Sequence, residues 1–347
     1  MPSDSPIDNL SVIIPAYNAA EWLPQSVPKV AIAAQKAGLG KVEIIIVDDG
    51  SSDNTAGIAK ALKVRYPVKV ISQPNGGRFL ARHTGVLAAK YDYILFIDTR
   101  VFIGEASLKY LVDTMRKAPG RLVWTSHAII DRQGNIYARF WEALTFITWR
   151  QYFGNPRDCS YGIKDFDRYP KGMTCFFAPK QIMLEADGWF EGKTKNARAS
   201  NDDTLIIRHI AEKHNINLNP QFYCTYHARA GLRQYSTHVY HRGKVFVDGF
   251  LRRDGNRFFW PLVGFLVSSV AVPVYLIIFP HYIVAALVLL GAAWALELLA
   301  AWLLKVPGKD ALSLFILSPL FAVLYGAGIW SAVFDIYAAK LWPNGST

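Results

Sequence analysis

The pattern of apolar and polar positions changes once along the chain, near residue 257. After it, three stretches are almost continuously apolar: residues 258–279, 282–304 and 311–334. Each reaches the roughly 20 apolar residues that a helix needs to cross a bilayer. A very apolar soluble domain is the alternative, but soluble helices rarely stay apolar on every face for this length. The pattern therefore predicts a large domain over residues 1–257 and an all-α transmembrane domain of three helices over residues 258–347.

The first hundred residues alternate short β-branched runs with longer mixed stretches. The runs are residues 10–15, 42–49, 68–72 and 93–98. The mixed stretches predict helices over residues 19–37, 54–66 and 76–90. This alternation predicts an α/β fold with a mostly parallel, doubly wound sheet. In such sheets ligands bind outside the carboxyl ends of the strands.

Polar residues follow several of these predicted strands and form a candidate nucleotide site. They are Pro15, Tyr17 and Asn18 after the first strand, Asp48 and Asp49 with Gly50 to Ser52 after the second, and Asp98 and Arg100 after the fourth. A tyrosine stacks on a base, and carboxylates accept hydrogen bonds from a base edge or ribose. Helix capping is the alternative for Asp49 and Ser52, but it does not explain clusters after three strands.

A glycine-rich segment, residues 75–85 (NGGRFLARHTG), follows the third run. Paired glycines such as Gly76 and Gly77 permit close approach of a phosphate. Arg78, Arg82 and His83 add positive charge on the helix that follows. Alone, this pattern is only weakly specific.

Charge and cysteine usage narrow the partners and the orientation. Lys and Arg flank the apolar stretches at residues 251–257 and 305–309, which predicts a cytosolic large domain and a C-terminus outside. No secretory signal peptide is recognisable. The net charge of +11, beside a membrane anchor, favours anionic lipid or phosphorylated substrates over nucleic acid. Cys159, Cys175 and Cys224 show no metal or disulfide spacing and are predicted to be buried thiols.

Several motifs resemble those of the family 2 glycosyltransferases, which are inverting enzymes built on the GT-A nucleotide-sugar fold. The resemblance covers roughly residues 10–243. It is carried by residues 11–27 (SVIIPAYNAAEWLPQSV), 42–55 (VEIIIVDDGSSDNT), 75–85, 93–100 (YILFIDTR), 173–192 (MTCFFAPKQIMLEADGWFEG) and 201–211 (NDDTLIIRHIA).

The resemblance implies roles for individual residues. Tyr17 and Asp49 would hold the nucleobase in a pocket shaped by Pro15, Asn18 and Asp48. Gly77, Arg82, Asp98 and Arg100 would lie along the nucleotide-sugar diphosphate, which His241 and Arg242 would close over. Asp203 would be the general base, with Asp202 as its neighbour.

The implied reaction is a single displacement, in which an acceptor attacks the anomeric carbon as the nucleoside diphosphate departs. An acceptor hydroxyl must lose its proton, and a carboxylate such as Asp203 is a suitable base; capping of the following helix is the alternative role. The family's Asp-x-Asp motif reads Asp98, Thr99, Arg100 here. Either Asp98 holds Mg²⁺ or Mn²⁺ with the diphosphate, or Arg100 partly replaces the cation. We expect retained but weaker cation dependence.

The acceptor side is predicted to face the membrane. Residues 137–153 (YARFWEALTFITWRQYF) fit an amphipathic helix at the bilayer surface or a core helix of the catalytic domain. A basic segment over residues 229–257 suits anionic headgroups or the phosphate of a polyprenyl carrier. Glu297, inside the second apolar stretch, has either a functional or a packing role.

The leading hypothesis is a glycosyltransferase of the inner membrane that moves a sugar from a nucleotide donor, favoured as a UDP-sugar, to a polyprenyl phosphate or lipid-linked glycan. A processive polysaccharide synthase is the close alternative, although Gln234 is not followed by the family's Arg-Trp signature. Nucleotidyl transfer and a non-catalytic membrane scaffold are the others. The sequence specifies neither the sugar, nor processivity, nor the oligomeric state.

Overall fold

The computed structural model describes residues 7–193, 202–251 and 258–341 of the chain. The chain divides into two compact units. The first comprises residues 1–131 and 151–227, and the second residues 132–150 and 228–347. The division therefore differs from the predicted boundary near residue 257, because residues 132–150 and 228–251 group with the apolar helices.

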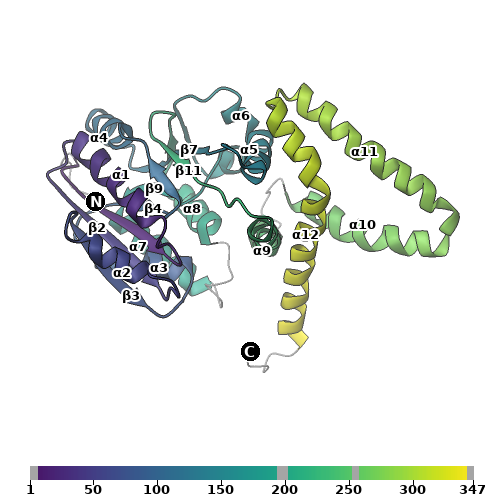
Figure 1. The fold of residues 1–347 in the computed structure, drawn as a ribbon, viewed down its shortest axis with the longest axis horizontal. Helices are drawn as coiled ribbons and strands as arrows, with labels where there is room; N and C mark the ends of the chain where they lie inside the picture. The colour runs from purple at the N-terminus through teal and green to yellow at the C-terminus, as the bar shows by residue number, and fades with distance from the viewer. Residues whose placement is uncertain (1–6, 194–201, 252–257, 342–347) are drawn as a thin grey trace. The chain divides into compact units, whose positions relative to one another are not determined.

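The first unit contains an eight-stranded sheet with the order β3-β2-β1-β4-β9-β6-β10-β8 (Figure 1). Neighbours among the first four strands pair in parallel, with Ile13 opposite both Ile45 and Phe96. β9 runs antiparallel to β4 and β6. The predicted mostly parallel α/β sheet is thus confirmed. The strands are β1 (Asn9–Ala16), β2 (Lys41–Asp49), β3 (Val68–Gln73), β4 (Tyr93–Ile97), β6 (Val123–Thr125), β8 (Cys159–Tyr161), β9 (Cys175–Pro179) and β10 (Ile216–Leu218).

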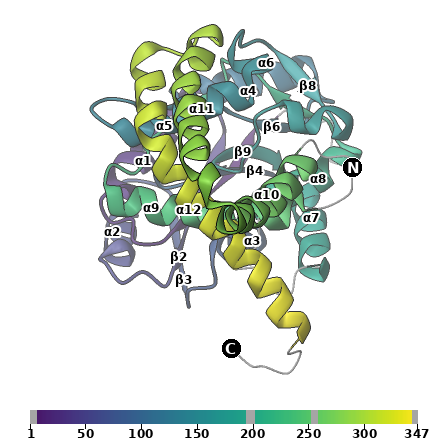
Figure 2. The same ribbon diagram turned by 90° about the vertical axis from the view of Figure 1, so that its right-hand side faces the viewer.

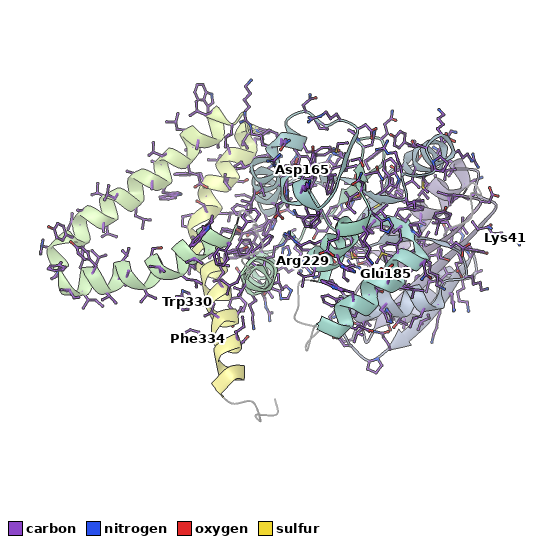
Figure 3. All side chains as sticks on the ribbon, turned by 180° about the vertical axis from the view of Figure 1, so that it is seen from behind. Lys41, Asp165, Glu185, Arg229, Trp330 and Phe334 are labelled. Carbon is purple, nitrogen blue, oxygen red and sulfur yellow. The ribbon has the colours of Figure 1, made fainter. Side chains whose placement is uncertain are left out.

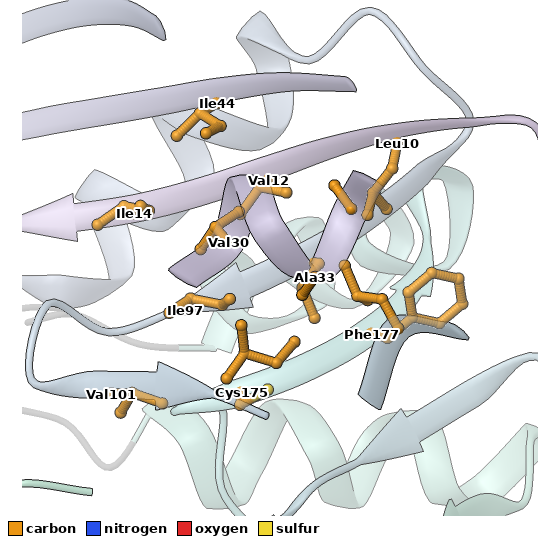
Figure 4. Close-up of a cluster of buried hydrophobic side chains, with 14 of the residues drawn as sticks. Leu10, Val12, Ile14, Val30, Ala33, Ile44, Ile97, Val101, Cys175 and Phe177 are labelled. Carbon is orange, nitrogen blue, oxygen red and sulfur yellow. The ribbon is translucent and has the colours of Figure 1, made fainter. Parts of the chain in front are cut away.

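Helices cover both faces of this sheet. They are α1 (Leu23–Lys36), α2 (Thr55–Leu62), α3 (Arg78–Ala88), α4 (Ser107–Lys117), α6 (Arg150–Phe153), η1 (Ile163–Arg168), α7 (Lys180–Lys193) and α8 (Asp202–Lys213). Side chains alternate along a strand, so Val12 and Ile14 of β1 enter the apolar cluster that includes α1 and α4, seen in Figure 4. Ile13 enters the opposite cluster with α3, α7 and α8. Burial on both faces explains the continuous apolar runs in the sequence.

A second, three-stranded sheet has the order β5-β11-β7 and was not predicted. Its strands are β5 (Val101–Ile103), β7 (His127–Ile130) and β11 (Tyr223–Tyr226). β11 pairs antiparallel with β5 and parallel with β7. The sheet therefore joins the chain just after Asp98 to a segment more than a hundred residues further on.

Helices are the regular elements of the second unit in its described residues. Its elements are α5 (Ile136–Thr148), α9 (Leu232–Phe250), α10 (Phe259–Ile278), η2 (Pro280–Tyr282), α11 (Ile283–Leu303) and α12 (Gly308–Leu341). Asn135 begins α5, because its Oδ1 accepts hydrogen bonds from the backbone N–H groups of Tyr137 and Ala138. Phe140 and Ala143 of α5 pack with Tyr235 of α9 and Leu314 of α12. The α5 part of the predicted aromatic segment therefore packs in the helical unit, whereas Tyr152 of α6 is buried in the core of the sheet unit.

Three helices of the second unit are long and apolar enough to cross a membrane, by length and composition: α10, α11 and α12. This confirms the three predicted apolar helices. Glu297 of α11 accepts a hydrogen bond of 2.6 Å from Ser318 of α12, and Trp294 stacks on Phe315 at 4.5 Å. Glu297 thus contributes to packing between these two helices.

Candidate active site

Arg82 of α3 joins the two acids that the sequence singles out most strongly. Its Nη2 lies 3.0 Å from Oδ1 of Asp98, which follows β4, and its Nη1 pairs with Oδ1 of Asp203, in the first turn of α8. The arginine is buried, with 3% of its side chain exposed, whereas the two carboxylates are 24% and 22% exposed. A strand end and a helix start are thereby held at one partly open position.

The backbone before β9 contacts both acids. The N–H of Asp98 donates to the carbonyl of Thr174 at 2.9 Å. The backbone N–H of Met173 donates to the carboxylate of Asp203. Residues 173–174 thus contact both Asp98 and Asp203, as Arg82 does.

The two carboxyl groups differ in acidity. Burial raises the pKa of Asp98, and the guanidinium of Arg82 only partly offsets this effect. Burial also opposes ionisation of Asp203, but Arg82 and Arg78 together outweigh it and lower its pKa. Asp203 is therefore ionised at neutral pH, which is the state that a general base requires.

A second pair fixes the helix that carries Arg82. Nδ1 of His83 lies 2.9 Å from Oδ2 of Asp187 on α7. This hydrogen bond raises the pKa of His83, although burial opposes the change. Burial in turn raises the pKa of Asp187. The pair fastens α3 to α7 beside the acids.

Asn18 fastens the loops that follow β1 and β2. Its Oδ1 accepts hydrogen bonds from the backbone N–H of Ser52 at 2.8 Å and the hydroxyl of Ser52 at 3.2 Å, and its own N–H donates to Ser51. Asn18 has φ of 49°, a conformation in which asparagine is enriched. Pro15 lies within β1 opposite Val47, and Tyr17 is exposed at 55%. Tyr17 is thus presented to solvent at the strand ends.

Asp49 is bonded within the protein. Its Oδ1 accepts from Gln73 Nε2 at 2.8 Å and from the backbone N–H of Gly76 at 2.9 Å, and its Oδ2 accepts from the N–H of Gly77 at 2.8 Å. The paired glycines therefore direct their amides to this carboxylate, and Gly77 adopts φ of 91° to do so. Asp48 accepts similarly from the N–H of Ser51. These bonds fix the loops that follow β2 and β3, where the sequence predicts the base and phosphate region.

Arg100 lies beside an aromatic cluster that the sequence did not reveal. Its guanidinium carbon is 4.5 Å from the centre of the Trp22 ring. His227 donates its backbone N–H to the carbonyl of Arg100 at 2.9 Å, and its ring lies 5.7 Å from Trp22. The imidazole also pairs with Asp131 at 3.1 Å. Trp22 and His227 are brought together only by the pairing of β5 and β11, which local sequence does not signal.

The described acids and histidines do not form a metal site by themselves. Among residues 7–193, 202–251 and 258–341, no group of three or more His, Cys, Asp or Glu side chains is placed to hold a metal ion. Asp98 offers one carboxylate. Arg100 stands where the Asp-x-Asp motif has its second acid, and its guanidinium lies over the Trp22 ring. Mg²⁺ commonly binds through one or two carboxylates together with substrate phosphates. The residues therefore fit a cation shared with a bound diphosphate better than a resident one.

The structure brings most of the predicted site residues into the first unit. Arg82 lies within α3, and the others lie at or near strand ends or helix starts there: Pro15, Tyr17, Asn18, Asp48, Asp49, Gly77, Asp98, Arg100 and Asp203. The side chain of Asp202 lies outside the described residues. His241 and Arg242 belong to α9 in the second unit, where Arg242 lies 5.0 Å from the Trp141 ring centre and donates to His238.

The mostly parallel α/β sheet, with acids and an arginine near the carboxyl ends of its strands, is an architecture of the GT-A class. Residues 11–178 match the family model described as Glycosyl transferase family 2. This region of the chain is thus a family 2 glycosyltransferase domain.

Proteins with similar sequences are named as glycosyltransferases or polysaccharide synthases. GlyG of Streptococcus pneumoniae serotype 4, a glycosyltransferase, is 30% identical over 131 residues, which are 37% of this chain and 42% of GlyG. YibD of Escherichia coli K12, named an uncharacterized glycosyltransferase, is 38% identical over 92 residues, 26% of each chain. The poly-beta-1,6-N-acetyl-D-glucosamine synthase of Staphylococcus epidermidis is 28% identical over 134 residues, 38% of this chain and 32% of that protein. The chain thus matches less than half of the length of each of these relatives.

One solved structure is similar over a larger share of the chain. The crystal structure of S. aureus TarS 1-349 in complex with UDP-GlcNAc has a TM-score of 0.49 at 16% sequence identity. It covers 72% of this chain and 68% of TarS 1-349.

Proposed function

We propose that the chain is an inverting glycosyltransferase that transfers a sugar from a nucleotide donor, a UDP-sugar in the favoured case, to an acceptor attached to a membrane lipid. The observation that carries this proposal is the bridge from Arg82 to Asp98 and Asp203. It joins the strand end where family 2 enzymes bind the diphosphate to the helix start where they place the base.

Asp203 acts as the general base in this proposal. Its lowered pKa keeps it ionised at neutral pH, and its partial exposure leaves room for an acceptor hydroxyl. When a donor binds, its diphosphate competes for the guanidinium of Arg82, because arginine binds phosphate oxygens well. The loss of that partner makes Asp203 a stronger base as the reaction begins.

The remaining strand-end residues bind the donor. Tyr17 stacks on the base, and Pro15, Asn18, Asp48 and Asp49 hold the loops that frame it. Positive charge near the departing diphosphate comes from Arg82, Arg78 and Arg100. It stabilises the negative charge that develops on the diphosphate in the transition state. His241 and Arg242 closing over the diphosphate stays a prediction from the family resemblance.

The acceptor is proposed to be a polyprenyl phosphate or a lipid-linked glycan at the cytosolic face of the plasma membrane. The long apolar helices support a membrane location. Lys and Arg before α10 and between α11 and α12 favour a cytosolic catalytic unit. Similarity to a named polysaccharide synthase supports processive elongation as the second candidate.

A donor screen with the full chain in detergent or membrane extract tests the proposal. We expect one nucleotide sugar to release nucleoside diphosphate when membrane lipid is present, and Asp203→Asn to lower the rate by a factor on the order of 10² to 10⁴. Asp113→Asn is the matched control, because Asp113 is a surface acid on α4. Equal rates for wild type and Asp203→Asn would refute the assigned base. Analysis of the lipid product separates single transfer from elongation.

Cation dependence is tested by binding. The fit of Asp98 to a shared cation predicts that Mn²⁺ binds the protein only when nucleotide is present, and that EDTA reduces activity without abolishing it. Calorimetric titration of Mn²⁺ with and without UDP measures the first effect. Tight Mn²⁺ binding without nucleotide would contradict the assignment.

A further inference from the structure

The third apolar helix differs from the other two in what covers it. Of the most apolar 18 residues of each helix, 6% are buried in α10 and 0% in α11, whereas 33% are buried in α12. α12 is also long, with 34 residues, or about 51 Å at 1.5 Å per residue. α10 and α11 form a hairpin whose turn points away from α12 in Figure 1 and toward the viewer in Figure 2, while Trp294 and Glu297 of α11 contact α12. The two kinds of helix therefore have different surroundings within this unit.

Charged partners bind both ends of α12. At its start, Asp310 is fully buried and pairs with Arg132 at 2.8 Å and Arg139 at 3.0 Å. Near its end, Asp335 pairs with Lys244 of α9 at 2.8 Å. Charges at the two ends alone are compatible with a spanning helix, so the middle of the helix decides the question.

The middle of α12 is covered by the polar helix α9 and by α5. Gly243 of α9 lies so close to α12 that a Cβ there would meet the backbone of Tyr325, and a Cβ on Gly328 would meet the backbone of Tyr240. Phe321 lies 6.1 Å from Trp141, which in turn contacts His238 and Arg242. α9 thus crosses α12 near its middle, and it carries exposed His241 and Arg242 at the crossing.

A spanning α12 would place this crossing in the hydrocarbon. The apolar stretch of residues 311–334 has its midpoint at residues 322–323, only a few residues from Tyr325. Exposed ionisable side chains, such as those of His241 and Arg242, are costly in the centre of a bilayer. The packing of α9 and a bilayer-spanning α12 are therefore in conflict.

The exposed apolar side chains of α12 give an independent indication. Among the described residues of α12, the exposed large apolar side chains are Leu312, Ile316, Val323, Phe334 and Ile336. At 100° per residue the first four fall within about 40° of one another on the helix, whereas Ile336 lies about 120° or more away. α10 and α11 are instead exposed around most of their circumference. Trp330, beside Phe334 in Figure 3, donates to Ser269 of α10 at 3.1 Å, so this part of α12 adjoins the base of the hairpin.

We propose that only the α10–α11 hairpin crosses the membrane and that α12, with α9 and α5, lies in the headgroup region as a lipid-binding surface. The stripe of Leu312, Ile316, Val323 and Phe334 faces the acyl chains, as in interfacial helices. Arg242 and Lys244 on α9 and tryptophans on α5 and α12 suit the polar boundary. The C-terminus then lies on the same side as the catalytic unit, opposite to the expectation from three spans. This inference does not depend on the sugar-transfer reaction.

Depth measurements on the full chain test the proposal. Val323→Cys and Leu290→Cys are made in a Cys159→Ser background, in which Cys175 and Cys224 are buried. Both target positions are exposed, at 70% and 68%, so neither change removes a packing contact of consequence. A fluorophore on each is read in phosphatidylethanolamine and phosphatidylglycerol vesicles that carry nitroxides at shallow or deep positions.

We expect the shallow nitroxide to quench the Val323→Cys label at least twice as strongly as the deep one, and the reverse for Leu290→Cys. Similar depths for the two labels would overturn the proposal, because residue 323 is the midpoint of a third span. A C-terminal epitope gives a second reading in sealed vesicles with the catalytic unit outward. Digestion of the epitope together with that unit supports the proposal, and protection until detergent is added overturns it.

Discussion

Arg82 sets the acidity of Asp203 in this structure. It is buried between two carboxylates and pairs with both. Its positive charge, with that of Arg78, lowers the pKa of Asp203 against the opposing effect of burial. The pKa of Asp203 is lowered in the folded protein, so its pairing with Arg82 stabilises the fold fully at pH values above the ordinary pKa of aspartate. That contribution is lost as pH falls through the lowered value.

Removing the arginine should therefore move the acidic side of the pH–activity profile. In Arg82→Gln we expect the pKa of Asp203 to rise, so that kcat/KM begins to fall at a higher pH than in the wild type. We also expect a rate loss of at least about tenfold, since the diphosphate loses a charge-assisted bond. Arg82→Lys should restore part of the profile.

The control for this prediction is Arg65→Gln, which removes an exposed arginine in the loop between α2 and β3. A profile for Arg82→Gln that lies on the wild-type curve would show that Arg82 does not set the acidity of the base. Circular dichroism at each pH separates an altered base from a partly unfolded protein.

The sequence identified the acids and Arg82 separately, through local motifs. It did not reveal that one arginine holds both acids, because Arg82 is 121 residues from Asp203. It likewise gave no reason to join Trp22 with His227. The hydrogen bonds of Asp49 to Gly76 and Gly77 were hidden for a related reason, since paired glycines serve equally to receive a phosphate or a carboxylate.

Whole helices and strands were predictable to the extent that their pattern was continuous. β1 to β4 have five to nine residues each and were found near their observed bounds. β5, β7 and β11 have only three or four residues, too few for a periodicity to appear. The amphipathic character of α5 was visible, but an apolar stripe does not state which partner covers it. The structure shows that its partners are α9 and α12.

The crossing of α9 and α12 predicts a sensitive glycine. In Gly328→Ala the added Cβ meets the backbone of Tyr240, which cannot move as a flexible side chain would. We expect a loss of stability of about 1–3 kcal/mol in the helical unit, typical of overpacking. Thermal unfolding of the purified full chain in detergent measures the effect as a lower melting temperature.

Gly264→Ala is the matched control, because nothing lies within 4 Å of a Cβ at that position on α10. It should leave the melting temperature unchanged or raise it slightly, since alanine favours helix more than glycine does. Equal melting temperatures for the two variants would argue against a close crossing of α9 and α12.

At the scale of the whole molecule, the α/β unit was largely predictable from the sequence, whereas the helical unit was only partly predictable. Hydropathy identifies helices long enough to span, but it does not record what packs on them. α12 satisfies the length and composition of a span while α9 covers its middle. The relation of residues 132–150 to the helical unit was hidden similarly, because the chain enters and leaves the sheet unit more than once.

All proposed chemistry requires that the strand ends of the first unit bind a nucleoside diphosphate. Calorimetric titration of the purified full chain with UDP and other nucleoside diphosphates, with Mn²⁺ and with EDTA, measures this property without any acceptor. We expect saturable binding of at least one of them at micromolar to millimolar concentrations, weakened several-fold in Arg82→Gln and unchanged in Arg65→Gln. Absence of binding to every nucleoside diphosphate, with and without the cation, would contradict the proposed function.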